Sequence, residues 1–311
     1  MSINYKDKQC FVTGGSGFIG QHLVKRLLDE GASVTVLDNF SFGGTHEIVD
    51  PRASIIEGDV RNSTSFIAPN TGNYDYIFHF GAPSSIVAFK EQHEKCRDIT
   101  VNGFINALNF AKNQKARLVY PSSGSIYSGA NRPHCESAEI QYDKLNNYAK
   151  AKIELEKIQK ENANVNSVGL RILAGYGPGE WHKGEHSSVP YLLAKAITKG
   201  EAPIIFGDGN QIRDFVFIED IINAILMLGE KAVEPVVNVG TGTAYSFNKV
   251  VETINEILGT NIKATYIPRP NLYLEVTTAD TTIFSKYYAT QTSLKDGLTK
   301  TIESIKEILA K

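Results

Sequence analysis

The sequence predicts an α/β protein built on a doubly wound parallel sheet, with a smaller C-terminal α/β lobe. Three observations lead to this class. A glycine-rich segment joins a strand-like run to a helix-like run near the N-terminus. Apolar strand-like runs then alternate with helical ones as far as residue 172, as expected for parallel strands joined by right-handed crossovers. Past Arg171, glycines and prolines interrupt the pattern, which indicates a change of lobe.

The first unit runs from a strand through a helix into a second strand. Residues 10–13 are apolar, residues 21–30 have a helical pattern, and residues 33–37 form an apolar run that ends at Asp38. A strand, a glycine-rich turn, a helix and a strand with an acid at its end form the unit that binds dinucleotides. The sheet is therefore expected to be of the Rossmann type.

Each glycine of the turn has its own task in such a unit. Gly14 permits the tight turn, Gly17 lets the backbone approach a pyrophosphate, and Gly20 allows the helix to pack closely against the strand. The phosphates would lie at the start of the helix, where the unpaired N–H groups of Phe18 and Ile19 and the helix dipole favour anions.

Asp38 and the residues after it indicate which dinucleotide binds. A carboxylate at this position accepts hydrogen bonds from a ribose diol and repels a 2′-phosphate. Neither arginine nor lysine stands in residues 39–41. NAD is therefore expected in preference to NADP.

The later elements continue the alternation. Residues 54–57, 76–80, 117–120 and 167–172 are typical of strands, and residues 98–113 and 147–161 of helices. Beyond them, residues 187–199 predict a helix and residues 203–206 a strand. We expect a dinucleotide-binding domain at residues 1–170 and a smaller substrate-binding lobe at residues 171–311, with part of residues 212–240 returning to the first domain. The ligand crevice would lie between this lobe and the carboxyl ends of the strands.

Composition and charge exclude several classes of protein. With 42% hydrophobic residues the chain can bury a full core, and a net charge of −2 without a basic block argues against nucleic acid or an anionic membrane as partner. Residues 1–9 are polar and mixed in charge, and no apolar run reaches the length of a membrane span. The scattered Cys10, Cys96 and Cys135 fit a reducing cytoplasm better than a disulfide framework.

A tyrosine and a lysine one helical turn apart form the candidate catalytic pair. Tyr148 and Lys152 share one helix face, and an adjacent ammonium favours the phenolate, so Tyr148 can act as a base near neutral pH. The same spacing occurs at Tyr191–Lys195 and Tyr245–Lys249. Only the first pair follows a serine-rich strand end, residues 120–127, from which Ser123 could hydrogen-bond a reacting hydroxyl.

Together these residues resemble the extended short-chain dehydrogenase/reductase family, and within it the NAD-dependent nucleotide-sugar epimerases. The similar segments span nearly the whole chain: residues 13–20, 37–39, 58–60, 79–82, Asn102, 122–123, Tyr148, Lys152, Arg171, 176–178, 207–215, Asp220 and 238–242. The resemblance implies further cofactor contacts from Asn39, Asp59 (at the adenine), Val60, Ala82, Asn102, Tyr148 and Lys152.

The resemblance also implies a substrate and an assembly. A nucleoside-diphosphate sugar would be contacted by Ser84, Ser125, Lys183 and Arg213. The guanidinium fork of Arg213 would clamp the diphosphate. Because relatives dimerise through paired helices, a homodimer is expected. Its apolar contact positions would include Val101, Ile105, Leu108, Ile153 and Leu155.

The two residues that follow Ser123 in the sequence argue against other branches of this family. Sugar dehydratases carry an Asp-Glu pair there, and GDP-mannose 3,5-epimerases carry a cysteine at the second position, whereas this chain has Gly124 and Ser125. Two further departures alter the expected substrate pocket. Ala174 replaces the asparagine of the usual Arg-x-x-Asn, and Asn271 replaces the glycine of the usual Arg-Pro-Gly-Asp.

The interpretation is an NAD-dependent epimerase of a nucleoside-diphosphate sugar, with C4 of a UDP-hexose as the favoured centre and Tyr148, Lys152 and Ser123 as catalytic residues. An alternative stays open because residues 179–184 are similar to a segment of ADP-heptose 6-epimerases, in which the lysine is a second acid/base. Lys183 would then serve an ADP- or GDP-linked heptose or hexose. A net dehydrogenase that releases NADH and an NAD-binding regulator are two further classes.

Overall fold

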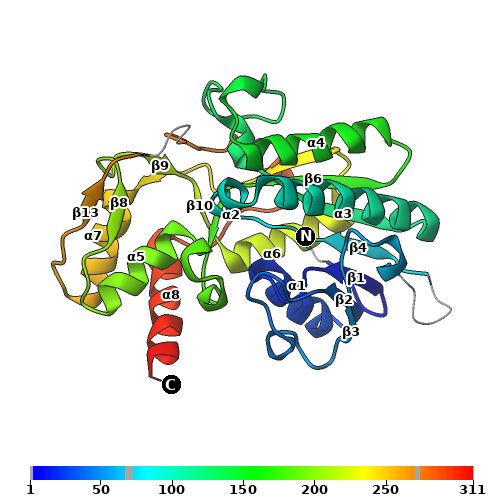
Figure 1. Ribbon diagram of the computed structural model, residues 1–311, viewed down its shortest axis with the longest axis horizontal. Coiled ribbons are helices and arrows are strands. Elements are labelled where there is room, and N and C mark those ends of the chain that lie inside the picture. The colour runs from blue at the N-terminus through cyan, green and yellow to red at the C-terminus, as the bar shows by residue number, and fades with distance from the viewer. Residues whose placement is uncertain (1–2, 67–72, 270–273, 311) are drawn as a thin grey trace.

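The computed structural model describes residues 3–66, 73–269 and 274–310. Its centre is a parallel sheet, of which β6, β4, β1, β2 and β3 are labelled in Figure 1. The full strand order is β11-β6-β5-β4-β1-β2-β3. The strands are β1 Gln9–Thr13, β2 Ser33–Asp38, β3 Ser54–Glu57, β4 Tyr76–His79, β5 Arg117–Ser123, β6 Ser167–Ile172 and β11 Val236–Val239. Because helices cover both faces of this sheet, the predicted doubly wound Rossmann-type fold is confirmed.

Different pairs of helices cover the two faces of the sheet. They are α1 Phe18–Asp29 with α6 Ile218–Lys231 on one face, and α3 His93–Gln114 with α4 Asn147–Glu161 on the other. Neighbouring side chains of a strand point to opposite faces, so Val12 packs in the first layer and Phe11 in the second. The carboxyl ends of the parallel strands meet at one edge, and the strand order reverses between β1 and β4. In such sheets ligands bind at that reversal.

A short helix that the sequence pattern does not predict, α2 Ile86–Glu91, follows β4. The hydroxyl of Ser85 caps it by accepting hydrogen bonds from the N–H groups of Val87 and Ala88. Helix α3 then begins at His93 and not at residue 98. The residues between these two positions are mostly charged and carry no apolar period, so the pattern gives no sign of the earlier start.

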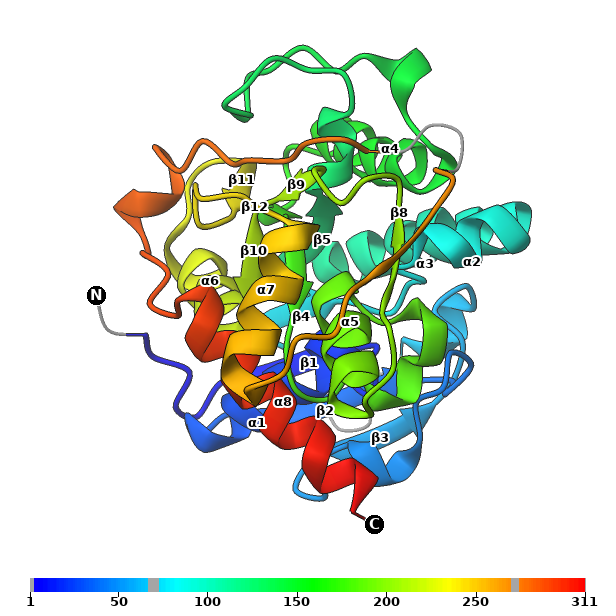
Figure 2. The ribbon, with the colours of Figure 1, turned by 90° about the vertical axis from the view of Figure 1, so that its left-hand side faces the viewer.

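The C-terminal lobe is smaller and packs three helices together (Figure 2). These helices are α5 Val189–Thr198, α7 Phe247–Leu258 and α8 Leu294–Leu309. Short strands pair as β7 Ala174–Tyr176 with β10 Phe215–Phe217, β9 Ile212–Arg213 with β12 Tyr245–Ser246, and β8 Ile204–Phe206 with β13 Thr265–Ile267. The helix and the strand predicted from residues 187–206 are present as α5 and β8.

The chain returns from this lobe to the main sheet before it ends. Helix α6 packs against α1, and β11 pairs with β6 as an edge strand of the sheet. The division of the chain at residue 170 into two domains stays a prediction. Within the described residues, no helix is both long and apolar enough to span a membrane.

Four of the five residues expected to form an apolar dimer contact are buried inside the protomer, and the fifth, Ile105, is half-buried against the same core. Val101, Leu108, Ile153 and Leu155 are each less than a tenth exposed, because they face the sheet or the loops beside it. The outward sides of α3 and α4 are linked by an ion pair between Arg97 and Glu154. The predicted apolar patch at these positions is therefore wrong, and the homodimer itself stays a prediction.

A buried ion pair ties α4 to the sheet. The guanidinium of Arg171 on β6 donates to both oxygens of Glu156 on α4, from Nε at 2.9 Å and from Nη2 at 2.7 Å. Its Nη1 also donates to the hydroxyl of Tyr127 at 2.8 Å. The hydroxyl of Ser122 at the end of β5 donates to the same carboxylate at 2.5 Å. The helix is thereby fixed in register against two strand ends.

We expect Arg171→Met to lower the free energy of unfolding by about 3–5 kcal/mol, because it leaves the buried Glu156 carboxylate without its cation. The double variant Arg171→Met, Glu156→Met should recover most of this loss. Arg97→Met is the matched control: its exposed pair with Glu154 should be worth less than about 1 kcal/mol. Urea unfolding gives the free energy of unfolding of all three variants. Equal decreases for Arg171→Met and Arg97→Met would contradict the assigned role of the buried pair.

Candidate active site

The glycine-rich turn between β1 and α1 has no room for a side chain at two positions. Gly14 has a φ of +73°, and a Cβ there would lie 2.6 Å from the carbonyl oxygen of Phe80. A Cβ on Gly20 would lie 1.9 Å from the carbonyl oxygen of Gly14. Gly20 thus allows close packing against the turn itself, and not against the strand as predicted. No side chain caps α1 at Gly17, so the first N–H groups of the helix are available to an anion.

A cavity leads from this turn along the carboxyl ends of β1, β2 and β4. Its lining includes Gly14, Gly17, Asp38, Asn39, Gly58, Val60, Ala82 and Pro83. Asp38 is held by three donors: the N–H of Ser16 at 2.9 Å, the hydroxyl of Ser16 at 2.7 Å and the N–H of Phe40 at 2.9 Å. Free helix N–H groups at one end and a fixed carboxylate at the other fit a dinucleotide with an unmodified ribose diol.

Asp59 and Asn102, both predicted at the cofactor, lie outside this lining. Asp59 accepts hydrogen bonds from the guanidinium of Arg61, which hold the pKa of its carboxyl below the usual range. The exposed amide of Asn102 donates to Asp98 at 2.6 Å, and Ile99 is the residue of α3 that lines the cavity. Neither residue lines this cavity, and the cofactor contacts predicted for both stay predictions.

Tyr148, Lys152 and Ser123 meet at the carboxyl end of β5. The side chains of Tyr148 and Ser123 are hydrogen bonded to each other. The ammonium of Lys152 lies 5.7 Å from the centroid of the Tyr148 ring and donates to the carbonyl of Pro121 at 3.0 Å. The hydroxyl oxygen of Ser123 accepts from the N–H of Ser125 at 3.1 Å. This arrangement places a phenol, a hydroxyl and an ammonium in one buried group.

Burial controls the acidity of this group. It raises the pKa of Tyr148, and the hydrogen bond with Ser123 offsets only part of this rise. It lowers the pKa of Lys152 to about 8. In this structure the Lys152 ammonium does not by itself offset the burial of the Tyr148 phenol, so the role of Tyr148 as a base stays a prediction. A further positive charge beside the phenol is needed to make it a base near neutral pH.

The unpredicted helix α2 completes this site. Phe89 packs its ring against Tyr148 in an edge-on arrangement, with the ring centroids 5.4 Å apart. Ala88 belongs to the same buried cluster. Sequence reasoning missed both residues, since six residues of mixed polarity do not show a helical period.

The other two tyrosine–lysine pairs are not placed for the same chemistry. Tyr191 is buried in the C-terminal lobe, and burial raises its pKa to about 12. Tyr245 stands in β12, before α7 begins at Phe247, so Tyr245 and Lys249 do not share a helix face. The spacing alone could not make this distinction.

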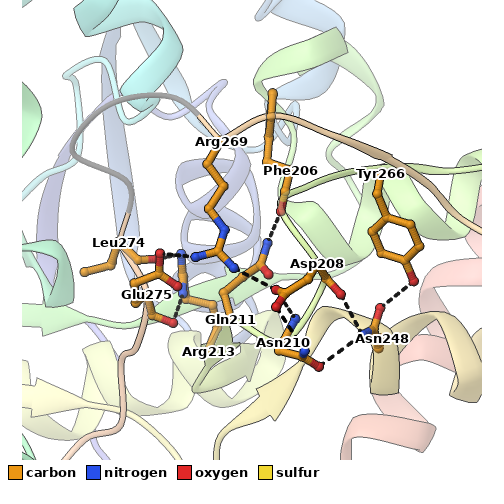
Figure 3. Close-up of polar contacts among 10 residues, drawn as sticks. All are labelled: Phe206, Asp208, Asn210, Gln211, Arg213, Asn248, Tyr266, Arg269, Leu274 and Glu275. Atoms are coloured by element: carbon orange, nitrogen blue, oxygen red, sulfur yellow. Dashed lines mark hydrogen bonds and ion pairs between the residues drawn. The ribbon is translucent and has the colours of Figure 1, made fainter.

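Two arginines lie together in the C-terminal lobe (Figure 3). Arg213 donates to the carbonyl of Glu275 at 3.1 Å and lies over the ring of Phe247. Arg269 pairs with the carboxylates of Asp208 at 2.7 Å and Glu275 at 2.5 Å. Only Arg213 was predicted as a site residue. Arg269 begins the segment whose sequence departs from the usual Arg-Pro-Gly-Asp, and it was not predicted as a site residue.

The remaining predicted positions are spread around the crevice. Ser84 is exposed beside the start of α2, and Ser125 is half-buried next to Ser123. Ala174 lies in β7, beside Phe215 of β10. Lys183 is paired with Glu180 at 3.0 Å. Asn271 lies outside the described residues.

Comparisons with known proteins add to this geometry. Residues 10–240 match the model of the NAD dependent epimerase/dehydratase family. A Methanocaldococcus jannaschii protein named "Putative UDP-glucose 4-epimerase" is 31% identical over 306 residues, 95% of this chain and 97% of that protein. UDP-glucose 4-epimerase with UDP-glucose from Thermotoga maritima has a TM-score of 0.89 and 26% identity, covering 97% and 99% of the two chains. ADP-L-glycero-D-manno-heptose-6-epimerase from Helicobacter pylori has a TM-score of 0.86 and 27% identity, covering 98% of each.

The lowered pKa of Lys152 predicts a measurable change of stability with pH. Below pH 8 the folded chain carries the full cost of a buried ammonium. Between pH 8 and 10.5 the unfolded chain binds more protons than the folded one, so stability rises with pH. Relative to Lys152→Met, the free energy of unfolding should therefore increase by about 3 kcal/mol across that window. Urea unfolding of both proteins at several pH values measures it, and parallel pH curves would contradict the shift.

Proposed function

The chain belongs to the NAD-dependent epimerase/dehydratase family of nucleotide-sugar enzymes, with NAD as cofactor, and on this premise we propose that it epimerises a nucleoside-diphosphate sugar. The proposed substrate is a UDP-hexose, and the proposed centre is C4. The observation that carries the proposal is the buried group of Tyr148, Ser123 and Lys152 at the carboxyl end of β5. The names of the relatives from M. jannaschii and T. maritima support the choice of sugar.

Epimerisation is favoured over dehydration because the site lacks an acid where dehydratases carry one. Gly124 is buried against Leu173, where a Cβ would meet the leucine side chain at 2.3 Å. Ser125 donates its N–H to Ser123 and carries only a hydroxyl. Elimination of water requires a group that protonates the leaving hydroxyl, and neither position supplies a titrating one.

The chain's own residues would manage the proton of the reacting hydroxyl. When bound, NAD supplies a hydride acceptor and a positive charge near the Tyr148 phenol. Tyr148 takes the proton from the sugar hydroxyl as the carbon is oxidised, and returns it when the keto-sugar is reduced from its other face. Ser123 holds the same oxygen, and Lys152 adds positive charge beneath the phenol. Hydride and proton are both returned, so the net reaction is an isomerisation.

The two arginines of the C-terminal lobe would hold the diphosphate. Arg213 and Arg269 both have guanidinium groups at the same segment, Leu274–Glu275, and guanidinium forks match phosphate oxygens. Arg269 donates hydrogen bonds to two carboxylates, those of Asp208 and Glu275, which occupy its donors much as phosphate oxygens would. We thus propose two arginines, Arg213 and Arg269, at the diphosphate, where the sequence predicts only Arg213.

A heptose 6-epimerase is the second candidate. The H. pylori structure is as similar in fold and identity as the UDP-glucose enzyme. This activity would give Lys183 the role of a second acid/base. Epimerisation of UDP-glucose to UDP-galactose, assayed beside an ADP-heptose, separates the candidates, and turnover of the heptose alone would overturn the UDP-hexose assignment.

Asp38 predicts selectivity for NAD. Isothermal titration should find NAD bound at least about 100-fold more tightly than NADP, because a 2′-phosphate would face the fixed carboxylate. Asp38→Asn removes the charge but keeps an acceptor for Ser16. In this variant the Kd values for NAD and NADP should differ by no more than about tenfold. Equal affinities for the two cofactors in the unmodified protein would contradict the assignment.

Tyr148→Phe should reduce turnover of the identified sugar by about 10²–10⁴-fold, since it removes the proton carrier. Its affinity for NAD should change little. Tyr191→Phe is the matched control, a buried tyrosine with the same lysine spacing, and should keep normal turnover. Initial rates at saturating substrate compare the three proteins, and near-normal activity of Tyr148→Phe would exclude Tyr148 as the base.

A further inference from the structure

A segment of the C-terminal lobe, residues 177–188, lies against the cofactor-binding elements. The side-chain amide of Gln21 on α1 donates to the carbonyl of Gly179 at 3.0 Å. The hydroxyl of Ser85, at the start of α2, lies 3.1 Å from Nδ1 of His186. The segment is therefore attached both to the helix that begins at the glycine-rich turn and to the helix that covers Tyr148.

A fully buried carboxylate holds this segment together. Glu180 accepts from the N–H of Ser188 at 2.6 Å, from the hydroxyl of Ser188 at 2.6 Å and from the N–H of Gly177 at 3.3 Å. Its fourth donor is the ammonium of Lys183 at 3.0 Å. The Lys183 side chain is itself only 18% exposed. A buried carboxylate needs such a partner, so the pair fixes where the ammonium lies.

The ammonium of Lys183 lies beside the start of α1. It is 5.1 Å from the centroid of the Phe18 ring, and Phe18 is the first residue of that helix. Lys183 also lines a cavity whose walls include Ser41 and Phe42, and the same two residues line the dinucleotide cavity. The two cavities thus share the wall of this loop, and the lysine lies beside the side-chain ring of the first residue of α1, a helix whose N-terminus has no side-chain cap.

We infer that Lys183 binds the pyrophosphate of NAD as a permanent cation, fixed by Glu180, and is not a second acid/base for the sugar. A positive charge and free helix N–H groups at one place both attract the two phosphates of a dinucleotide. Attachment of the C-terminal lobe to the cofactor at this point would also help to keep NAD bound while the sugar is oxidised and reduced. The inference rests on the cofactor alone and not on the identity of the sugar.

The contrast with Lys152 supports this assignment. Lys152 is buried and has no carboxylate partner among the residues that the structure describes. Its pKa is lowered to about 8, within reach of proton exchange near neutral pH. Lys183 forms an ion pair with the Glu180 carboxylate at 3.0 Å, which fixes the position of its ammonium. Lys152 is therefore the lysine suited to influence a proton, and Lys183 is the one that a carboxylate holds in place.

The test is a titration of cofactor-free protein with NAD and with ADP-ribose, which carries the same pyrophosphate but no nicotinamide. Lys183→Met should raise the Kd of both by about 10–100-fold, the value of a charge-assisted contact. Lys183→Arg keeps the positive charge, so its Kd for NAD and for ADP-ribose should stay within about threefold of the values for the unmodified protein. Lys195→Met, which removes a partly buried lysine of the following helix, is the matched control and should leave both affinities unchanged.

Two further measurements keep the test decisive. Because Lys183→Met leaves Glu180 buried without its cation, the double variant Glu180→Gln, Lys183→Met should show the same loss of NAD and ADP-ribose affinity in a protein without that charge. At saturating NAD, the turnover of the identified sugar by Lys183→Met should stay within about tenfold of that of the unmodified protein. Loss of an acid/base would lower this turnover by about 10²–10⁴-fold. Unchanged affinity for NAD, or weaker binding of NAD with unchanged binding of ADP-ribose, would overturn the inference.

Discussion

The ion pair between Arg171 and Glu156 is the interaction on which the geometry of the catalytic group depends. Glu156 stands one helical turn after Lys152 and two turns after Tyr148, so fixing its carboxylate fixes all three side chains along α4. The pair is buried, and Ser122 and Tyr127 add hydrogen bonds to it. Sliding α4 along the sheet would separate two buried charges, at a cost of about 3–5 kcal/mol. Tyr127 extends the network to Asn238 on β11, so the edge strand of the sheet shares the same support.

The cationic side chains of the site differ in their partners, and the partner sets the chemistry. Lys152 has a backbone carbonyl, so burial acts on it without compensation and its pKa falls. Lys183 has a carboxylate and a nearby aromatic ring. Arg269 has two carboxylates, those of Asp208 and Glu275, in a more open setting. The same net charge is thus paired with a backbone carbonyl in one case, a buried carboxylate in the second and two exposed carboxylates in the third.

The parts of the site that could be predicted from the sequence are local in the chain. The turn at Gly14, the acid at Asp38 and the spacing of Tyr148 and Lys152 each lie within one strand–helix unit, where residue type and period decide the structure. The fold class followed from the repetition of such units.

The parts that could not be predicted depend on contacts between distant segments. Ser16, in the turn after β1, donates to Asp38 at the end of β2. Phe89 packs against Tyr148 from α2, a helix whose sequence shows no clear helical period of apolar residues. Asn102 fits a motif by its identity, but the turn of α3 directs its amide to Asp98. Val101 and Ile153 are apolar and so suggest an interface, yet only the packed structure shows which side of each helix they occupy.

The return of the chain to the main sheet has a consequence for synthesis on the ribosome. The strands up to β6 can pair once residue 172 has emerged, but α1 then lacks α6, the helix that packs beside it on the same face of the sheet. That contact forms only when α6, ending at Lys231, has been made and has folded back. The nascent cofactor-binding half must therefore pass through a stage with an uncovered hydrophobic face, while most of the C-terminal lobe is still being translated.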